Sequence, residues 1–254
     1  MLERTFHTPL PLELEVGIPS GHIEVETAEG EESNITVDGD ERLLEEVEIR
    51  HDGNRLVVAY RGKGKFGFSL SPLSLVFGSE LRVRARLPHA AAVKVKTASA
   101  DTRLDGHFGP LGINSVSGDV RLRGEVDGAA NIKTVSGDAE LDRVDGDLSA
   151  HTVSGDLRFG PTAGSSDLKT VSGDIRIQSV TAGDIRFTSV SGDIEVGIAQ
   201  GSALDVDAGS TSGDLSSEVP LGSEPIPEAE EADAPTVILR GRTVSGDVKV
   251  FRAN

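Results

Sequence analysis

Residues 170–177 read Thr-Val-Ser-Gly-Asp-Ile-Arg-Ile, and close copies of this stretch recur along the chain. The tripeptide Ser-Gly-Asp occurs in seven copies, whose glycines are Gly118, Gly137, Gly155, Gly173, Gly192, Gly213 and Gly246. The first five copies follow one another at intervals of 18 or 19 residues. A second series of glycines, from Gly109 to Gly201, divides each interval into steps of nine or ten. The repeat unit is therefore about nine residues long, and its full identity returns in every second unit.

Apolar and polar residues alternate after each Gly-Asp pair, as Ile175 and Ile177 do on either side of Arg176. This alternation predicts short strands, and residues 98–215 contain no helical periodicity. Two all-β architectures fit the pattern. One is a single-chain β-solenoid with about 18–19 residues per coil, and the other is an antiparallel β-meander or sandwich with a hairpin every nine residues.

Identity between equivalent positions favours the solenoid. In a solenoid, Ile175 would stack on Leu157, and the repeated valines would stack on one another and bury a continuous core. In a meander, Val171 would instead oppose the region of Thr162, where the match is poorer. The valines concerned are Val116, Val135, Val153, Val171 and Val190.

The sequence divides into two parts between residues 97 and 98. Residues 1–97 are strand-rich but lack the nonapeptide, and we expect them to continue or cap the solenoid, with a hairpin at Asp52-Gly53 and a short helix within 40–46. Residues 98–254 form the repeat solenoid. A loop over residues 216–235, with six acidic residues, four prolines and no basic residue, interrupts it. We expect this loop to leave and re-enter one solenoid.

Composition excludes several classes of function. The 254 residues include 42 acidic and 25 basic side chains, so the net charge of −17 argues against binding to nucleic acid. The absence of cysteine excludes disulfides, thiolate metal sites and a cysteine nucleophile. No apolar stretch reaches the roughly 20 residues that span a bilayer. We therefore expect no direct membrane insertion and, without an apolar N-terminal leader, a cytoplasmic protein.

The repeated Thr-Val-Ser-Gly-Asp lies behind a strand-rich segment that reaches it through an arginine-rich strand ending in Leu87-Pro88. This arrangement resembles a bacterial β-strand-repeat domain family catalogued as "putative adhesins" of unknown function, and it is similar to the wider toastrack group of β-solenoids. The resemblance covers nearly the whole chain and implies a right-handed solenoid. It also implies a link to envelope-stress signalling, because related domains accompany such proteins, and it carries over no catalytic residues.

The aspartates that follow the repeat glycines are the first candidate site. Unit charges one coil apart, at about 4.8 Å, repel by about 0.9 kcal/mol even in water. Turn chemistry explains them if Gly supplies a positive φ and if Ser and Asp side chains bond nearby backbone N–H groups. The alternative is a calcium-stabilised, β-roll-like binding module. Its metal ligands would be the cation edge formed by Asp119, Asp138, Asp156, Asp174 and Asp193.

Calcium-binding nonapeptides carry Gly-Gly-x-Gly-x-Asp, whereas here a single Gly directly precedes Asp. We therefore predict that the seven repeat glycines mark structural turns and that the protein holds no metal and no cofactor. A second candidate is an apolar patch in the loop before residue 80, which would either cap the core or dock a partner. It consists of Phe66, Phe68, Leu70, Leu73, Leu75 and Phe77.

Catalysis has little support in the sequence. The six histidines show no metal-ligand spacing, and residues 209–213 miss the nucleophile-elbow pattern because Thr211 stands at the centre. A carbohydrate-active solenoid enzyme remains the alternative, but the aspartates belong to a repeated motif, whereas a catalytic pair should stand apart from it. We predict that the protein is no enzyme but a scaffold, with a protein partner or a second copy of itself.

Overall fold

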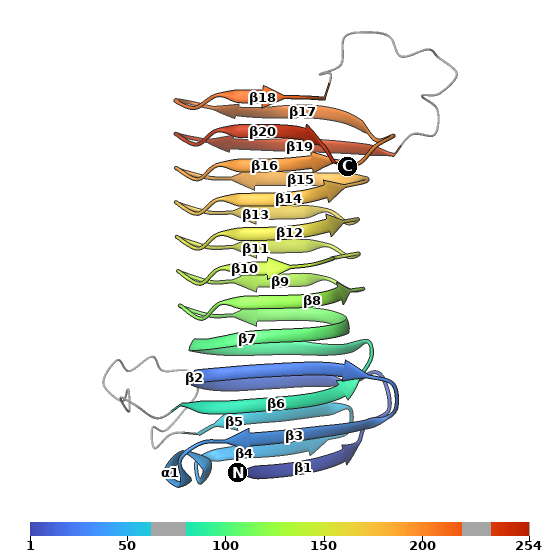
Figure 1. The fold of residues 1–254 in the computed structure, drawn as a ribbon, viewed down its shortest axis with the longest axis vertical. Coiled ribbons are helices and arrows are strands. Elements are labelled where there is room, and N and C mark those ends of the chain that lie inside the picture. Colours follow the sequence, from blue (N-terminus) through green and yellow to red (C-terminus); the bar gives the residue numbers. More distant parts are fainter. Residues whose placement is uncertain (62–79, 220–234, 254) are drawn as a thin grey trace.

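The structure is a computed structural model that describes residues 1–61, 80–219 and 235–253. The strands wind into flattened coils with two long faces (Figure 1). Two long strands, β2 (Glu13–Ala28) and β7 (Ala91–Asn114), bend around an edge and contribute to both faces. The first face also contains β1 (Leu2–His7), β3 (Glu32–Asp38), β6 (Leu81–Pro88), β8 (Val120–Val126), β10 (Ala139–Leu141), β12 (Leu157–Thr162), β14 (Ile175–Val180), β16 (Ile194–Ile198), β20 (Val248–Arg252) and β18 (Leu215–Ser217). The second contains β4 (Val47–Asp52), β5 (Arg55–Tyr60), β9 (Ala130–Lys133), β11 (Leu148–His151), β13 (Ser166–Lys169), β15 (Gly183–Thr188), β19 (Thr236–Thr243) and β17 (Ala203–Ser210).

Parallel pairing between coils decides the architecture. Strand β12 pairs in parallel with β10 on one side and β14 on the other, and Leu157 lies opposite Ile175, as predicted. Strand β13 pairs in the same way with β11 and β15. The fold is therefore the β-solenoid, with two strands and two corners per coil, and the meander is wrong for the repeat.

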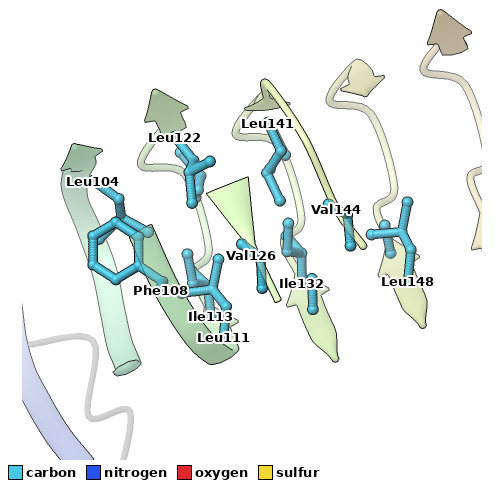
Figure 2. Packing of buried hydrophobic residues seen from close by; sticks show 14 of the residues in the cluster. Leu104, Phe108, Leu111, Ile113, Leu122, Val126, Ile132, Leu141, Val144 and Leu148 are labelled. Carbon is cyan, nitrogen blue, oxygen red and sulfur yellow. The ribbon is translucent and has the colours of Figure 1, made fainter. Parts of the chain in front are cut away.

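The core is a single layer of mostly aliphatic side chains between the two faces, with Phe108, Phe159 and Phe187 among them. Leu104, Leu122 and Leu141 project from successive coils of the first face toward Ile113 and Ile132 of the second (Figure 2). All of them are buried and belong to one cluster that continues into the N-terminal segment. Stacking of like residues at each level fills the narrow interior, which explains why the chain needs few aromatic residues.

The repeat valines do not line this core, and that part of the prediction is wrong. Val116, Val135, Val153, Val171 and Val190 stack from coil to coil, but their side chains are exposed. The threonine before each central valine is buried instead, as Thr170 is before Val171. At this corner the chain turns, so the period-two alternation of a strand no longer decides which side chain points inward.

The conformational reason that we gave for the repeat glycines is also wrong. None of the seven has a positive φ. Each is required by close approach of the coils: a Cβ at Gly173 would lie 1.9 Å from the carbonyl oxygen of Gly155 in the coil before it. Glycine therefore stands at this position because no side chain fits between stacked turns.

The N-terminal segment adds coils and closes the first end of the stack. Strand β2 pairs in parallel with β5, β6 and β7. Beyond it the pairing turns antiparallel, in β1 with β3, β3 with β6, and β4 with β5 across the predicted hairpin. The expected short helix is α1 (Glu41–Leu44). The division expected between residues 97 and 98 falls inside β7, so the two segments share a strand.

The last coil in sequence is not the last coil in space. Strand β19 pairs in parallel with both β15 and β17, and β20 pairs with both β16 and β18. The C-terminal coil β19–β20 therefore lies between β15–β16 and β17–β18, as Figure 1 shows near the top of the stack. The chain does re-enter the solenoid after residue 235, as expected, but it enters one coil below the end.

Two predicted features lie outside the described residues. One is the apolar patch from Phe66 to Phe77, and the other is most of the acidic loop 216–235, of which Ser216 and Ser217 belong to β18. Within the described part of the chain, no helix is long and apolar enough to cross a membrane.

Candidate interaction surface: the valine corner

The corner that leads from each strand of the second face to the first has one repeated local structure. Thr170 points inward, and its Oγ1 accepts a hydrogen bond of 2.9 Å from the backbone N–H of Gly173. The same bond joins Thr134 to Gly137 and Thr152 to Gly155, at 3.0 Å in each case. Because the hydroxyl closes the turn from inside, the valine between them projects outward.

Hydrogen bonds between coils hold these turns in register. The backbone N–H of Ser172 donates to the carbonyl oxygen of Val153 at 2.9 Å, and Ser172 Oγ lies 3.4 Å from the same oxygen. Equivalent bonds continue up the stack, so the valines form one straight ridge at the coil spacing of about 4.8 Å. We call this ridge the valine corner; its members, in spatial order, are Val116, Val135, Val153, Val171, Val190 and Val244.

The valine corner is an exposed apolar surface. Its six side chains retain between 39% and 50% of their accessible area. They account for most of the large exposed hydrophobic residues in the described part of the chain. Continuous apolar surface on a soluble protein commonly marks an interaction site, whereas scattered exposed residues do not.

One side of the ridge carries the repeat aspartates, which we call the acidic flank. The backbone N–H of Asp174 donates to Oδ1 of Asp156 at 3.0 Å, and the bond recurs in each coil. Arg158 pairs with Asp156 at 2.7 Å, but no ion pair reaches Asp138, Asp174 or Asp193 from the described residues. The flank runs, in spatial order, through Asp119, Asp138, Asp156, Asp174, Asp193, Asp247 and Asp214.

The geometry of the acidic flank bears on the calcium alternative. One oxygen of each bonded carboxylate already accepts a backbone N–H, although this N–H belongs to the neighbouring coil and not, as predicted, to the same turn. In the described residues, no three ligand atoms of this flank lie within 4.8 Å of one another. Calcium takes six to eight oxygen ligands. A single carboxylate ladder with half of its oxygens engaged offers far fewer at any one point.

The other side of the ridge carries a second column, which we call the basic flank. Lys133 lies opposite His151, and His151 opposite Lys169; Arg242 continues the column beyond Thr188. No ion pair reaches Lys133 from the described residues, whereas Lys169 lies 2.7 Å from Asp167. The hydrogen bond from Lys169 is the largest influence on the pKa of Asp167, and it lowers that pKa. Burial acts in the opposite direction, but the pKa of Asp167 remains below its ordinary value.

A family model described as Toastrack DUF4097 matches residues 12–251. The chain belongs to this toastrack family. Among solved structures, the toastrack chain is similar to a "putative adhesin" from Bacteroides fragilis NCTC 9343, with 13% identity, a TM-score of 0.52, and 98% of this chain and 96% of that one covered.

A "putative adhesin" from Parabacteroides distasonis ATCC 8503 also matches, with 15% identity and a TM-score of 0.45 over 98% of this chain and 96% of that one. At such identities only the likeness to the Bacteroides protein supports an argument, and it concerns the fold alone. None of the curated proteins matches the toastrack chain.

The opposite corner of the toastrack solenoid carries a charged group that the sequence analysis missed. His107 lies between two carboxylates, with its Nε2 bonded to Asp127 and its Nδ1 3.5 Å from Glu125. The bond to Asp127 raises the pKa of His107 above the ordinary 6.5, although burial opposes the rise. The charges of Asp127, Glu125 and Asp145 add to it. His107 and Glu125 are 18 residues apart, so the coil length could have revealed the contact.

A shallow groove of about 290 Å³ lies on the outer side of the first face, where the N-terminal segment meets the repeat array. Its carboxylates are Glu24, Asp101 and Asp119. Asp101 and Asp119 belong to the repeat ladder, since the N–H of Asp119 donates to Asp101. Glu24 pairs with Arg84 at 3.4 Å. The toastrack groove thus holds carboxylates with structural partners, rather than an isolated pair poised for acid–base chemistry.

Proposed function

We propose that the protein is a noncatalytic scaffold that binds another protein, or a second copy of itself, along the valine corner. One observation carries the proposal: six exposed valines form one apolar ridge, whereas only three other large hydrophobic side chains of the described residues, Met1, Leu10 and Leu215, are exposed. A ridge that only stabilised the fold would lie inside, as the neighbouring Ile175 does. The exposed valines add little to the core, so their apolar surface is free for a partner.

The chemistry of the surface supports a protein as the partner. A valine ridge between two charged flanks offers apolar contact at its centre and polar contact at its rim, which is the usual anatomy of a protein–protein interface. Membership of a family whose solved relatives bear the description "putative adhesin" agrees with a binding role. The resemblance to domains that accompany envelope-stress proteins supports partners in that signalling system.

The test is co-purification of the intact protein from its native cells. Val135→Ser, Val153→Ser and Val171→Ser are combined to make the ridge polar without altering the core. Ala129→Ser and Ala163→Ser, both exposed at the opposite corner, form the matched control. We expect a specific partner to bind the parent protein and the control but not the ridge variant. A partner retained equally by all three proteins would exclude the valine corner as the site.

A further inference from the structure

We propose that two copies of this chain pack side by side through their valine corners, with their long axes parallel and related by a two-fold axis along the stack. This inference rests on the proposed function, because it names the occupant of the same surface. It does not involve the ends of the solenoid. It follows from three properties of the corner: its spacing, the signs of its two flanks and the order of the residues across it.

The spacing makes the ridge complementary to itself. The valines recur once per coil at about 4.8 Å, so a second copy is a partner whose apolar side chains repeat at the same interval over the full length. An extended peptide presents same-side residues at about 6.6–6.8 Å and falls out of register within a few coils. Only another solenoid edge keeps valine against valine from Val116 to Val244.

The order of residues across the corner fixes the relative orientation. Four of the six turns run from the basic flank, over the ridge, to the acidic flank, as in Lys133, Val135 and Asp138, and Asn114 and Thr188 take the basic-flank position in the other two. Rotation by 180° about an axis parallel to the stack places the acidic flank of each copy beside the basic flank of the other. Rotation about a perpendicular axis that keeps the ridges in contact would instead place acidic flank against acidic flank, which is repulsive.

With no offset along the axis, the two members of every facing pair occupy equivalent places in a single turn of the sequence. Lys133 of one copy faces Asp138 of the other, and Lys169 faces Asp174. His151 meets Asp156 and Arg242 meets Asp247 in the same manner. Such reciprocal contacts, in which residue i touches residue j and the reverse, are those of an isologous dimer. Lys133 and Asp138, which have no ion-pair partner within the described residues, would each gain one.

The size of the surface limits the strength of the dimer. The ridge spans six coils, about 25–30 Å, and it is only one side chain wide. Stable complexes bury about 800 Å² per partner, and this contact is smaller. The net charge of −17 on each copy also opposes association, although salt at physiological strength screens it beyond about 8 Å. We therefore expect a weak dimer, populated at high local concentration.

The first experiment measures self-association of the intact chain by sedimentation equilibrium, up to millimolar concentration at physiological salt. We compare Val135→Ser with Val171→Ser, which alters the ridge, and Lys133→Glu with Lys169→Glu, which alters the basic flank. The matched charge control is Arg86→Glu with Arg123→Glu, exposed on the first face and without ion pairs among the described residues. Each corner variant should raise the dissociation constant by about tenfold or more, and the control should not.

The second experiment fixes the orientation. The chain has no cysteine, so Val116→Cys or Val190→Cys introduces a single thiol near one end of the ridge. In the parallel dimer each of these residues faces its own copy, so oxidation should crosslink each variant to itself. In an antiparallel dimer Val116 would approach the far end of the other ridge, and self-crosslinking would be confined to the middle.

A chain that stays monomeric at every concentration overturns the parallel dimer. Crosslinking of a third variant, Val153→Cys in the middle of the ridge, without crosslinking of Val116→Cys or Val190→Cys overturns it too. If a different protein is then lost from the ridge variant in co-purification, the proposed function stands and only the identity of the partner is wrong. If the chain stays monomeric and the ridge variant retains every partner, both proposals fail.

Discussion

Oδ1 of Asp174 accepts the backbone N–H of Asp193, its equivalent in the next coil, at 2.9 Å. The carboxylate of each coil thus serves as the acceptor for the coil that follows. This bond explains how a column of like charges persists along the stack, because each repulsion is accompanied by a charge-assisted hydrogen bond.

Because Asp174 is a hydrogen-bond acceptor, we expect two substitutions of this residue to differ in their effect on the free energy of unfolding. Asp174→Asn keeps the oxygen and removes one charge from the column, so we expect it to match or exceed the parent in free energy of unfolding. Asp174→Ala removes the acceptor and should lower that free energy by about 0.5–1.5 kcal/mol. Urea denaturation measures both. Equal losses for the two variants would mean that charge, and not the hydrogen bond, matters at this position.

The close approach of Gly173 to Gly155 predicts a large effect of a small change. A Cβ at residue 173 would overlap the carbonyl oxygen at 1.9 Å, so Gly173→Ala should cost about 3 kcal/mol in free energy of unfolding as coils separate. Gly17→Ala is the matched control, since no atom lies within 4 Å of its added Cβ and its φ is not positive. Thermal and urea unfolding of both variants test the difference. A small loss of free energy of unfolding in Gly173→Ala would show that adjacent turns can move apart to make room for a side chain.

Calcium should not stabilise the fold specifically, because one oxygen of each bonded carboxylate in the ladder already accepts a backbone N–H. We expect the melting temperature in calcium to equal that in magnesium at the same concentration, and chelator to leave it unchanged. Differential scanning calorimetry provides the comparison. A rise that appears with calcium alone would revive the calcium-stabilised module.

The raised pKa of His107 predicts a stability change near neutral pH. The folded state binds the proton more tightly than the unfolded state, whose pKa is near 6.5. The contribution is therefore fully present below pH 6.5 and is lost as the pH rises through the higher folded value. The groups that face the imidazole are Asp127, Glu125 and Asp145, with Arg143 bonded to Asp145, and the ring of His89, whose centroid lies 6.0 Å away.

Asp127→Asn removes the largest cause of this shift and should return the pKa of His107 toward its ordinary value. Titration of the imidazole by NMR measures it directly. His151→Gln is a suitable control, because His151 lies at the other corner of the solenoid and its replacement should leave His107 unchanged. If His107 titrates identically in the parent and in Asp127→Asn, the bond to Asp127 has no influence in solution.

Because the C-terminal coil, β19–β20, lies beneath β17–β18, we expect a substitution in β19 to destabilise β17 and β18 as well. Leu239 is fully buried in β19, and Leu239→Ala should cost about 2–5 kcal/mol locally. Because β17 and β18 pair, among the described strands, only with β19 and β20, we expect faster amide hydrogen exchange in all four strands, and unchanged exchange in β8 to β13. Protection retained in β17 and β18 would contradict the order of the coils.

The repeat period predicted the coil and its register because contacts in a solenoid follow directly from sequence spacing. The direction of Val171 could not be predicted from alternation, since Thr170 takes the inward position to bond Gly173. The basic flank was available in principle from the 18-residue steps of Lys133, His151 and Lys169, but each residue looks ordinary alone. The position of β19–β20 in the stack could not be predicted from the sequence. Its repeat residues fit equally well next to β15–β16 or beyond β17–β18.

That place has a consequence for how the protein is made. Synthesis delivers the chain from the N-terminus, and coils up to Ile198 can stack in the order in which they leave the ribosome. Strands β17 and β18 emerge next, but the strands with which they pair in the finished fold, from Thr236 to Arg252, are synthesised after them. The outermost coil, β17–β18, therefore reaches its final place only after the coil beneath it, β19–β20, has been synthesised. The solenoid is complete when residues 236–252 have been translated, and not when β17 and β18 appear.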